Sequence, residues 1–320
     1  FSLAFNLGAD YVGNSYTYYY NPYFGNAAGS GRLNKEWTKT FSYTFNQLLT
    51  YNRSFGVHNV DVLLGHENYS YKFNLLSAQK TGFPFGGLYE LGPGSTIADA
   101  NSYENNETME SYFSRVQYNY NDKYFLSGSF RSDGSSRFHV DNRWGNFWSL
   151  GGAWKISEEN FLKDVSWLDY LTLKASIGES GNNSVGLYAW QAFYDLTWNN
   201  ANNNGGSVTS IENKNVSWEK NQQVNLGFDG RFLANRLTIG FDWYNRKTND
   251  MLLYNPMAMS LGFEGYYDNI GNMKNSGFDL TVGYDVIKSQ DLTWNITAMG
   301  SKVSNEVLKL TEAQKEIISG

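Results

Sequence analysis

Long runs in which an apolar residue returns at every second position constrain the fold of this chain more than any other feature. The clearest run covers residues 237–244, where Leu, Ile, Phe and Trp alternate with Thr, Gly, Asp and Tyr. Side chains of a β-strand point alternately to its two faces, whereas a helix returns to one face after about 3.6 residues. The sequence therefore predicts an all-β chain whose strands have one apolar face. A sandwich strand would alternate in the same way, so the period alone leaves sandwich and barrel open.

The lengths of the connections help to separate these two architectures. We place eleven strands at about 1–9, 37–51, 57–73, 107–120, 123–132, 144–155, 170–180, 217–232, 236–254, 273–287 and 291–304. Long segments at about 10–36, 74–106, 181–216 and 255–272 alternate with short ones at 52–56, 121–122, 233–235 and 288–290. Long extracellular loops and short periplasmic turns are typical of an antiparallel up-and-down barrel in an outer membrane. Segment 156–169 is long for such a turn, and residues 157–162 resemble a capped helical turn.

Strand length and aromatic placement both favour a membrane. Several runs alternate over ten or more residues, and a tilted strand that crosses the hydrocarbon needs about 9–11. Tyr and Trp gather toward strand ends, for example at Tyr51, Tyr124 and Trp154, where a ring with a polar tip suits the headgroup level. No stretch approaches the roughly eighteen apolar residues of a spanning helix. We therefore expect strands, flanked by an aromatic girdle, to cross the membrane.

The odd number of predicted strands indicates part of a barrel. Single-chain bacterial barrels close with an even number of antiparallel strands, and 22 strands form the large plugged transporters. We expect residues 1–320 to be one partial transmembrane β-barrel domain, with about 11 strands of a 22-stranded barrel.

Composition narrows the functions that remain. The chain has no Cys, so it offers no disulfide, thiolate metal site or Cys nucleophile. Its formal net charge of -6 has the wrong sign for a partner of nucleic acid. The three histidines lie far apart without metal-ligand spacing, and the 31 acidic residues show no fixed separation that would indicate glycoside hydrolysis. We expect no catalytic residue, no metal, no cofactor and no nucleic-acid partner.

Five sequence blocks are specific enough to compare with a known family. They are residues 124–138, residues 144–154, residues 173–182, the VSWEK stretch at 216–220, and the NIGNMKNSGF stretch at 269–278. In this order they closely resemble the barrel of SusC/RagA-type TonB-dependent transporters, and the likeness covers nearly all of the chain.

The resemblance implies energised import across the bacterial outer membrane. The imported nutrient is commonly an oligosaccharide and in some members a peptide, and no bond in it is broken. The implied partners are a SusD-like lipoprotein that covers the external loops, TonB, which pulls on a plug, and outer-membrane lipid. The family's TonB-contacting segment, its plug and its last strands have no counterpart in residues 1–320, so we expect the middle of such a barrel.

Aromatic residues in the long segments are the candidate ligand contacts. Flat rings suit the C–H faces of sugars, while amides and carboxylates suit their hydroxyls. The candidates are Tyr18, Tyr19, Tyr20, Tyr188, Trp190 and Trp198. Contact with the lid lipoprotein, or packing of a loop on itself, is an alternative for each of them.

A second group of candidates lies where a strand is expected to end. Arg131, Asp133 and Arg137 could form an anion or sugar site on the lumen wall, but an ion pair of Arg131 with Asp133 or another lumen carboxylate that stiffens the wall is the favoured interpretation. Two further functions stay open from the sequence. One is a structural or adhesive outer-membrane barrel through which nothing passes, and the other is a soluble all-β carbohydrate-binding or hydrolytic module.

Overall fold

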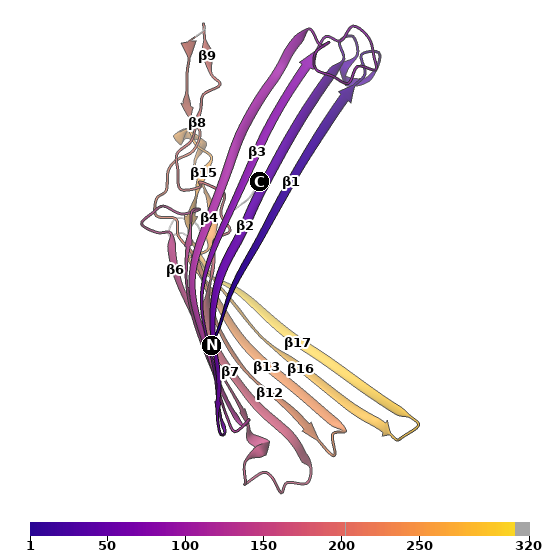
Figure 1. Cartoon of the computed structure of the whole chain (residues 1–320), viewed down its shortest axis with the longest axis vertical. Coiled ribbons are helices and arrows are strands. Elements are labelled where there is room, and N and C mark those ends of the chain that lie inside the picture. The colour runs from indigo at the N-terminus through magenta and orange to yellow at the C-terminus, as the bar shows by residue number, and fades with distance from the viewer. Residues whose placement is uncertain (202, 311–320) are drawn as a thin grey trace. The chain divides into compact units, whose positions relative to one another are not determined.

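An eleven-stranded antiparallel sheet dominates the computed structural model, which describes residues 1–201 and 203–310 (Figure 1). Its order is β1-β2-β3-β4-β5-β6-β7-β12-β13-β16-β17, so strands that follow one another along the chain lie next to each other. In the described part of the chain, β1 and β17 each pair on one side only. The prediction of an all-β chain with about eleven sheet strands is confirmed.

The strands of the main sheet differ in length. Their bounds are β1 (Ser2–Tyr20), β2 (Arg32–Phe55), β3 (His58–Thr81), β4 (Thr96–Tyr120), β5 (Tyr124–Ser135), β6 (Trp144–Lys155), β7 (Leu168–Asn182), β12 (Glu219–Phe232), β13 (Leu237–Asn249), β16 (Asn272–Lys288) and β17 (Thr293–Lys309). Three short hairpins pair β8 (Tyr194–Asp195) with β11 (Ser207–Val208), β9 (Asn199–Asn200) with β10 (Asn203–Asn204), and β14 (Leu252–Pro256) with β15 (Gly265–Asn269). The 3-10 helices are η1 (Gly25–Ala27), η2 (Ile156–Glu158) and η3 (Met259–Leu261). No helix of the described residues is long and apolar enough to cross a membrane.

The chain divides into two compact units, which we describe separately. The first unit comprises Phe1–Ala4, Gln47–His66 and the chain from Ser111 onward, and the second comprises Phe5–Asn46 and Glu67–Glu110. In the first unit, strands from β5 to β17 meet at short turns at one end and at longer loops at the other. We call these the short-turn end and the long-loop end.

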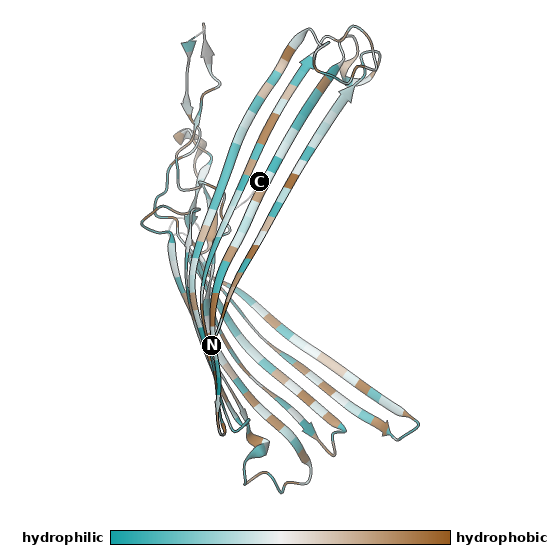
Figure 2. Cartoon of the chain, viewed as in Figure 1, coloured by the Kyte–Doolittle hydropathy of each residue, from teal (hydrophilic) through white to brown (hydrophobic). Residues whose placement is uncertain are grey.

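The register of the first unit sorts side chains onto an apolar and a polar face. One cross-strand row of the apolar face contains Leu280, Phe241, Phe228, Leu173, Trp154 and Tyr124. The rings of Phe228 and Phe241 stack at 6.0 Å, a kind of cross-strand pair that adds about 0.2–1 kcal/mol. Figure 2 shows hydrophobic and hydrophilic positions alternating along β13, β16 and β17.

The neighbouring row belongs to the opposite, polar face. It contains Asp279, Asp242, Gly227 and Lys174. A Cβ atom at Gly227 would lie 2.3 Å from Oδ1 of Asp242. It would also lie 2.7 Å from the Phe241 carbonyl oxygen, so a larger residue at position 227 would force the backbone or the Asp242 side chain to shift.

Two of the expected long loops are wrong in extent. Segments 10–36 and 74–106 were expected to be loops, but β1 and β2 leave only residues 21–31 between them, and β3 and β4 leave only residues 82–95. The alternation of apolar residues weakens along these strands, although their Tyr and Thr residues still favour extended backbone. Hydrogen bonding between neighbouring strands thus continues beyond the part that the alternation marks.

The strand expected at 236–254 and the loop expected at 255–272 also need correction. Strand β13 ends at Asn249, and Asp250 takes a left-handed conformation with φ of 55° that interrupts it. Residues 252–269 then form the β14–β15 hairpin around η3. The expected helical turn near residue 157 exists as η2, but its N-cap is Lys155 and no side chain caps it. The long segment 181–216 contains the two small hairpins β8–β11 and β9–β10.

Candidate functional site

A small buried cluster in the first unit holds the bases of the long loops. Phe138, Phe147, Val185, Val216 and Trp218 are all buried. The Trp218 ring packs against Phe138 at 5.4 Å and against Phe147 at 5.3 Å, and its Nε1–H donates to the Arg143 carbonyl at 2.8 Å. This loop anchor connects the β5–β6 loop with the two ends of the β7–β12 loop.

Local sequence makes room for the anchor. The Phe147 ring lies over Gly181, where a Cβ would come within 2.1 Å of the ring. On the other side, the Arg137 guanidinium donates to the Val185 carbonyl. Four of the five blocks used for the family resemblance contribute to this anchor, through residues such as Arg137, Phe147, Gly181 and Trp218.

Asparagine side chains extend the anchor to the β14–β15 hairpin. Asn269 accepts from the Ser217 N–H at 2.7 Å, and its amide donates to the carbonyls of Ser217 and Asp250, both at 2.9 Å. Asn213 donates to the Tyr267 carbonyl at 2.9 Å. These bonds replace strand pairing where β13 has been interrupted, so the fifth block, at 269–278, also joins the base of the loops.

The carboxylate of Glu219 joins two strands to the hairpin. One oxygen accepts from the Asn182 amide at 3.2 Å and from the Asn221 amide at 3.3 Å. The other accepts from the Leu252 N–H at 3.2 Å. Glu219, in the VSWEK stretch, thus connects β7, β12 and β14 at the long-loop end.

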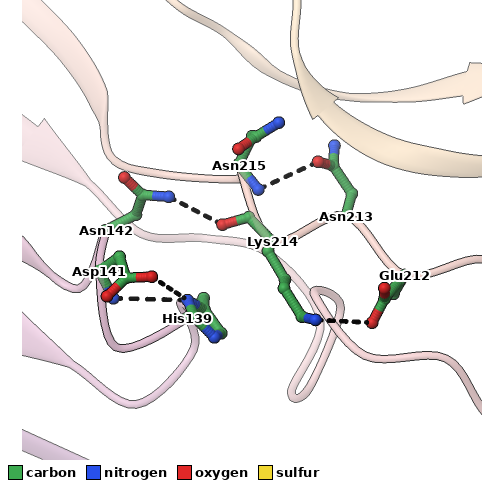
Figure 3. A network of polar contacts seen from close by, with 7 residues as sticks. All are labelled: His139, Asp141, Asn142, Glu212, Asn213, Lys214 and Asn215. Atoms are coloured by element: carbon green, nitrogen blue, oxygen red, sulfur yellow. Dashed lines mark hydrogen bonds and ion pairs between the residues drawn. The ribbon is translucent and has the colours of Figure 1, made fainter.

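Figure 3 shows a more exposed set of contacts beside the anchor. Asn142 donates to the Lys214 carbonyl at 2.8 Å, which joins the β5–β6 loop to the end of the β7–β12 loop. Nδ1 of His139 lies 3.2 Å from Oδ2 of Asp141, and Nζ of Lys214 lies 3.3 Å from Oε2 of Glu212. In the part of the chain that the structure describes, no three metal-ligating side chains gather into a possible ion site.

The predicted aromatic candidates in the β7–β12 loop differ in exposure. Trp190 is half-buried and meets the His139 ring edge-on at 5.1 Å, while Tyr188 packs edge-on against Phe193 at 6.5 Å. Trp198 lies between the two small hairpins and is 62% exposed. We call residues 193–208 the aromatic arm, because Tyr194, at 63%, is exposed with Trp198.

One carboxylate stiffens the arm. Asp195 accepts from the hydroxyl of Thr197 at 2.6 Å and from its N–H at 2.9 Å. These two bonds hold the pKa of the Asp195 carboxyl below its ordinary value. The side chain is therefore charged at neutral pH and fixes the turn that leads to Trp198.

The three predicted tyrosines of the second unit lie on strand β1 and not in a loop. Successive residues of a strand point to opposite faces. Tyr18 is exposed and stacks with Tyr16 at 6.2 Å, and the Tyr20 ring lies 4.1 Å from the Arg32 guanidinium. On the other face, the Tyr19 hydroxyl accepts from the Gly87 N–H at 2.8 Å. Tyr19 thus holds segment 82–95, whereas Tyr18 and Tyr20 face the other way.

The Arg131 group forms the expected ion pair. Nε of Arg131 lies 2.6 Å from Oδ1 of the buried Asp133, and Nη2 donates to the Ser111 hydroxyl at 2.9 Å. The Arg131 guanidinium also lies 5.0 Å from the centre of the Phe113 ring. The Arg137 guanidinium donates to the Val185 carbonyl and so contributes to the loop anchor.

A second charged group on the polar face was not predicted as a unit. Nζ of Lys174 lies 2.8 Å from Oδ2 of Asp229 and 3.3 Å from Oδ1 of Asp242. It borders an open hollow of about 750 Å³ whose other lining groups include Arg53 and Asp61. The sequence showed these residues singly, because they come from strands far apart along the chain.

These features define a class of protein. An up-and-down antiparallel sheet with one apolar face, one polar and charged face, and long aromatic loops opposite short turns is the wall of an outer-membrane β-barrel. The chain belongs to the TonB dependent receptor-like, beta-barrel family, whose model matches residues 1–315. Lipid therefore covers its apolar face, and the sheet is part of a barrel. The family is one of receptors and transporters and not an enzyme class.

Individual relatives agree with this assignment. The chain is 32% identical over 299 residues to TonB-dependent receptor P3 of Formosa agariphila, covering 89% of this chain and 29% of the relative. It is 32% identical over 325 residues to TonB-dependent receptor SusC of Bacteroides thetaiotaomicron, covering 96% of this chain and 31% of the relative. The chain thus spans about a third of the length of these relatives. The resemblance to SusC/RagA-type barrels is confirmed.

Solved structures of related transporters support the same family assignment. A structure of the RagAB peptide transporter superposes with a TM-score of 0.90 at 30% identity and covers 98% of this chain and 35% of that one. The ferric citrate transporter FecA shares only the fold, with a TM-score of 0.53 at 11% identity.

Proposed function

We propose that this chain is the central part of the barrel of a TonB-dependent importer that takes up an oligosaccharide. In this proposal TonB acts through a plug, and a SusD-like lipoprotein closes over the long loops, which face the cell exterior. The observation that carries the proposal is the aromatic arm, where Trp198 and Tyr194 expose their rings from a loop whose base is rigidly anchored.

The arm has the chemistry that sugars need. A ring presents a flat apolar face to C–H groups, while nearby amides and carboxylates bind hydroxyls. The arm is rich in Asn, and Asp195 is charged. We assign ligand or lid contact to Trp198 on the arm and to Tyr18 and Tyr20 on β1. We assign loop support to Tyr19, Tyr188 and Trp190, which pack against their own loops or neighbouring segments.

We assign the charged residues of the polar face to the wall of the lumen. Arg131 and Asp133 neutralise each other, and Lys174 is held between two carboxylates. Paired charges of this kind keep the interior polar without leaving a strong field of one sign, so ligand and plug can move past it.

Peptide import is the second candidate function. It is favoured by the similarity to the RagAB peptide transporter, whose 30% identity is close to the 32% identity with SusC. A peptide would use the same exposed rings for its side chains and the loop amides for its backbone.

Binding to the full-length protein with its lipoprotein partner tests these assignments. We would titrate panels of oligosaccharides and of peptides by calorimetry, comparing Trp198→Ala with Leu196→Ala. Leu196 is a matched control because it is 71% exposed on the same arm but has no ring. Loss of a stacking ring should weaken binding by about 5- to 10-fold, and Leu196→Ala should change it little.

The panels separate the two candidates. Binding of oligosaccharides alone supports the first, and binding of peptides alone replaces it with the second. Equal affinities for Trp198→Ala, Leu196→Ala and the parent protein would show that the arm does not contact the ligand. Failure of every ligand in both panels to bind would contradict the proposed uptake of an oligosaccharide or peptide.

A further inference from the structure

The turn between β6 and β7, residues 156–167, is fastened to the apolar face of the sheet at its first end. Glu159 accepts hydrogen bonds from the Tyr124 hydroxyl and, at 3.1 Å, from Nε1–H of Trp154. Tyr124 and Trp154 face each other across β5 and β6 and belong to the apolar row that includes Leu173. Lys123 pairs with the same carboxylate at 3.3 Å. The turn therefore starts by folding toward the side of the sheet that lipid covers.

The last residue of the turn lies on the same side. The Trp167 ring stacks on Phe232 at 6.0 Å. Phe232 shares the parity of Phe228 along β12, and its ring covers Gly230 of that strand. The Trp167 carbonyl accepts from the Leu233 N–H at 2.9 Å, which ties the turn to the next turn along the short-turn end. Both ends of the turn are thus held against the apolar face.

The turn also exposes large apolar side chains, one near its middle and one at its last residue. Phe161 is 67% exposed and Trp167 is 56% exposed. Lys163 is also exposed, beside Phe161. The turn also carries the acids Glu158, Glu159 and Asp164, so the aromatic rings, and not a basic patch, are its membrane-seeking feature; Trp in particular is enriched at membrane–water interfaces. Here the turn continues directly from the lipid-covered row at Tyr124 and Trp154.

We propose that residues 156–167 form an interfacial anchor that rests on the phospholipid of the leaflet at the short-turn end. In this arrangement Phe161 and Trp167 enter the headgroup and upper acyl region, while Lys163 reaches the phosphates. The Glu159 carboxylate stays at headgroup level, where charged side chains are tolerated. The unusual length of this turn, compared with residues 233–236 or 289–292 at the same end, then has a function in holding the barrel at its depth in the membrane.

Depth-dependent quenching tests the anchor in the full-length protein. A single cysteine at Phe161, in a background otherwise free of cysteine, would carry an environment-sensitive fluorophore in phosphatidylcholine nanodiscs. Phe161 is exposed, so the change to cysteine removes little packing. Doxyl groups on the acyl chains should quench the probe by about twofold or more, and aqueous iodide should quench it weakly.

Two matched probes give the comparison. Gln290→Cys lies in the exposed β16–β17 turn at the same end, and Asp141→Cys lies in an exposed loop at the other end. Both should be quenched mainly by iodide. Adding Glu159→Ala to Phe161→Cys should restore iodide quenching, because the first fastening is lost. The proposal is overturned if the Phe161 probe behaves like the Gln290 probe, or if removing Glu159 leaves its quenching unchanged.

Discussion

Replacing Trp218 by alanine should detach the bases of the long loops while leaving the sheet intact. The ring is buried between Phe138 and Phe147, with centroid distances of 5.4 and 5.3 Å. Removing a buried Trp costs about 3–5 kcal/mol. The lost bond to the Arg143 carbonyl adds only about 1 kcal/mol, since that carbonyl also accepts from the Ser135 N–H at 3.0 Å.

The loss of the Trp218 contacts should make the bases of the long loops open more often, without unfolding the sheet. The lower end of the combined cost, about 4 kcal/mol, corresponds to a factor of roughly 1,000 in an equilibrium constant. Hydrogen exchange of peptides covering 136–143 and 211–218 should therefore accelerate by about that factor or more, while peptides from β12 and β13 keep their protection. Trp218→Phe is the control, because it keeps an apolar ring but loses the N–H bond and part of the indole volume. It should accelerate exchange by at least about fivefold, and by much less than Trp218→Ala.

Two results would refute this reasoning. Exchange in both loop segments that stays within about threefold of the parent protein for Trp218→Ala would mean that the ring does not hold the loops. Equal acceleration by the Ala and Phe variants would mean that the hydrogen bond, and not the packing, is the dominant contribution.

Three further predictions follow from contacts elsewhere in the first unit. Asn269→Ala removes three hydrogen bonds and should cost about 2–3 kcal/mol, measured as faster proteolysis within 250–271; unchanged cleavage would contradict the bridging role. Lys174→Met leaves Asp229 and Asp242 without their shared cation. It should lower the free energy of unfolding by about 1 kcal/mol, seen as a slightly lower melting temperature. If the loss of stability in Lys174→Met is as large at high salt as at low salt, its cause is not electrostatic. Hydrogen bonds from Tyr124 and Trp154 hold the pKa of Glu159 below its ordinary value of 4.5. The stabilisation from this carboxylate is therefore complete above pH 4.5 and is lost as the pH falls through the lowered pKa. The Phe161 probe should move toward water in acid, and Glu159→Gln should abolish that pH dependence.

The sheet was largely predictable because strand periodicity is a local signal. Strand β6 was predicted at 144–155 and occupies Trp144–Lys155, and β12 was predicted at 217–232 and occupies Glu219–Phe232. The error at β1 to β4 has a physical cause. Apolar alternation reports which side of a strand faces lipid, whereas strand pairing needs only backbone hydrogen bonds and continues where that alternation fades.

The candidate site was less predictable, because its contacts join residues far apart along the chain. Trp198 could be recognised as a loop aromatic, but nothing local distinguishes it from Trp190, which packs on His139. The loop anchor was missed for the same reason, since Phe138 and Trp218 are 80 residues apart along the chain. The only signal in the sequence was that both lie in blocks shared with the family, and a resemblance does not say which residues touch.

The central claim is that lipid covers one face of this sheet and an aqueous lumen the other. Spin labels placed singly at Ile239, Gly240, Phe241 and Asp242 of β13, in the full-length protein in nanodiscs, test it directly. Accessibility to oxygen should be high at Ile239 and Phe241, and accessibility to a water-soluble nickel chelate should be high at Gly240 and Asp242. Shielding of Ile239 and Phe241 from oxygen would contradict this arrangement, since protein would then cover the apolar face.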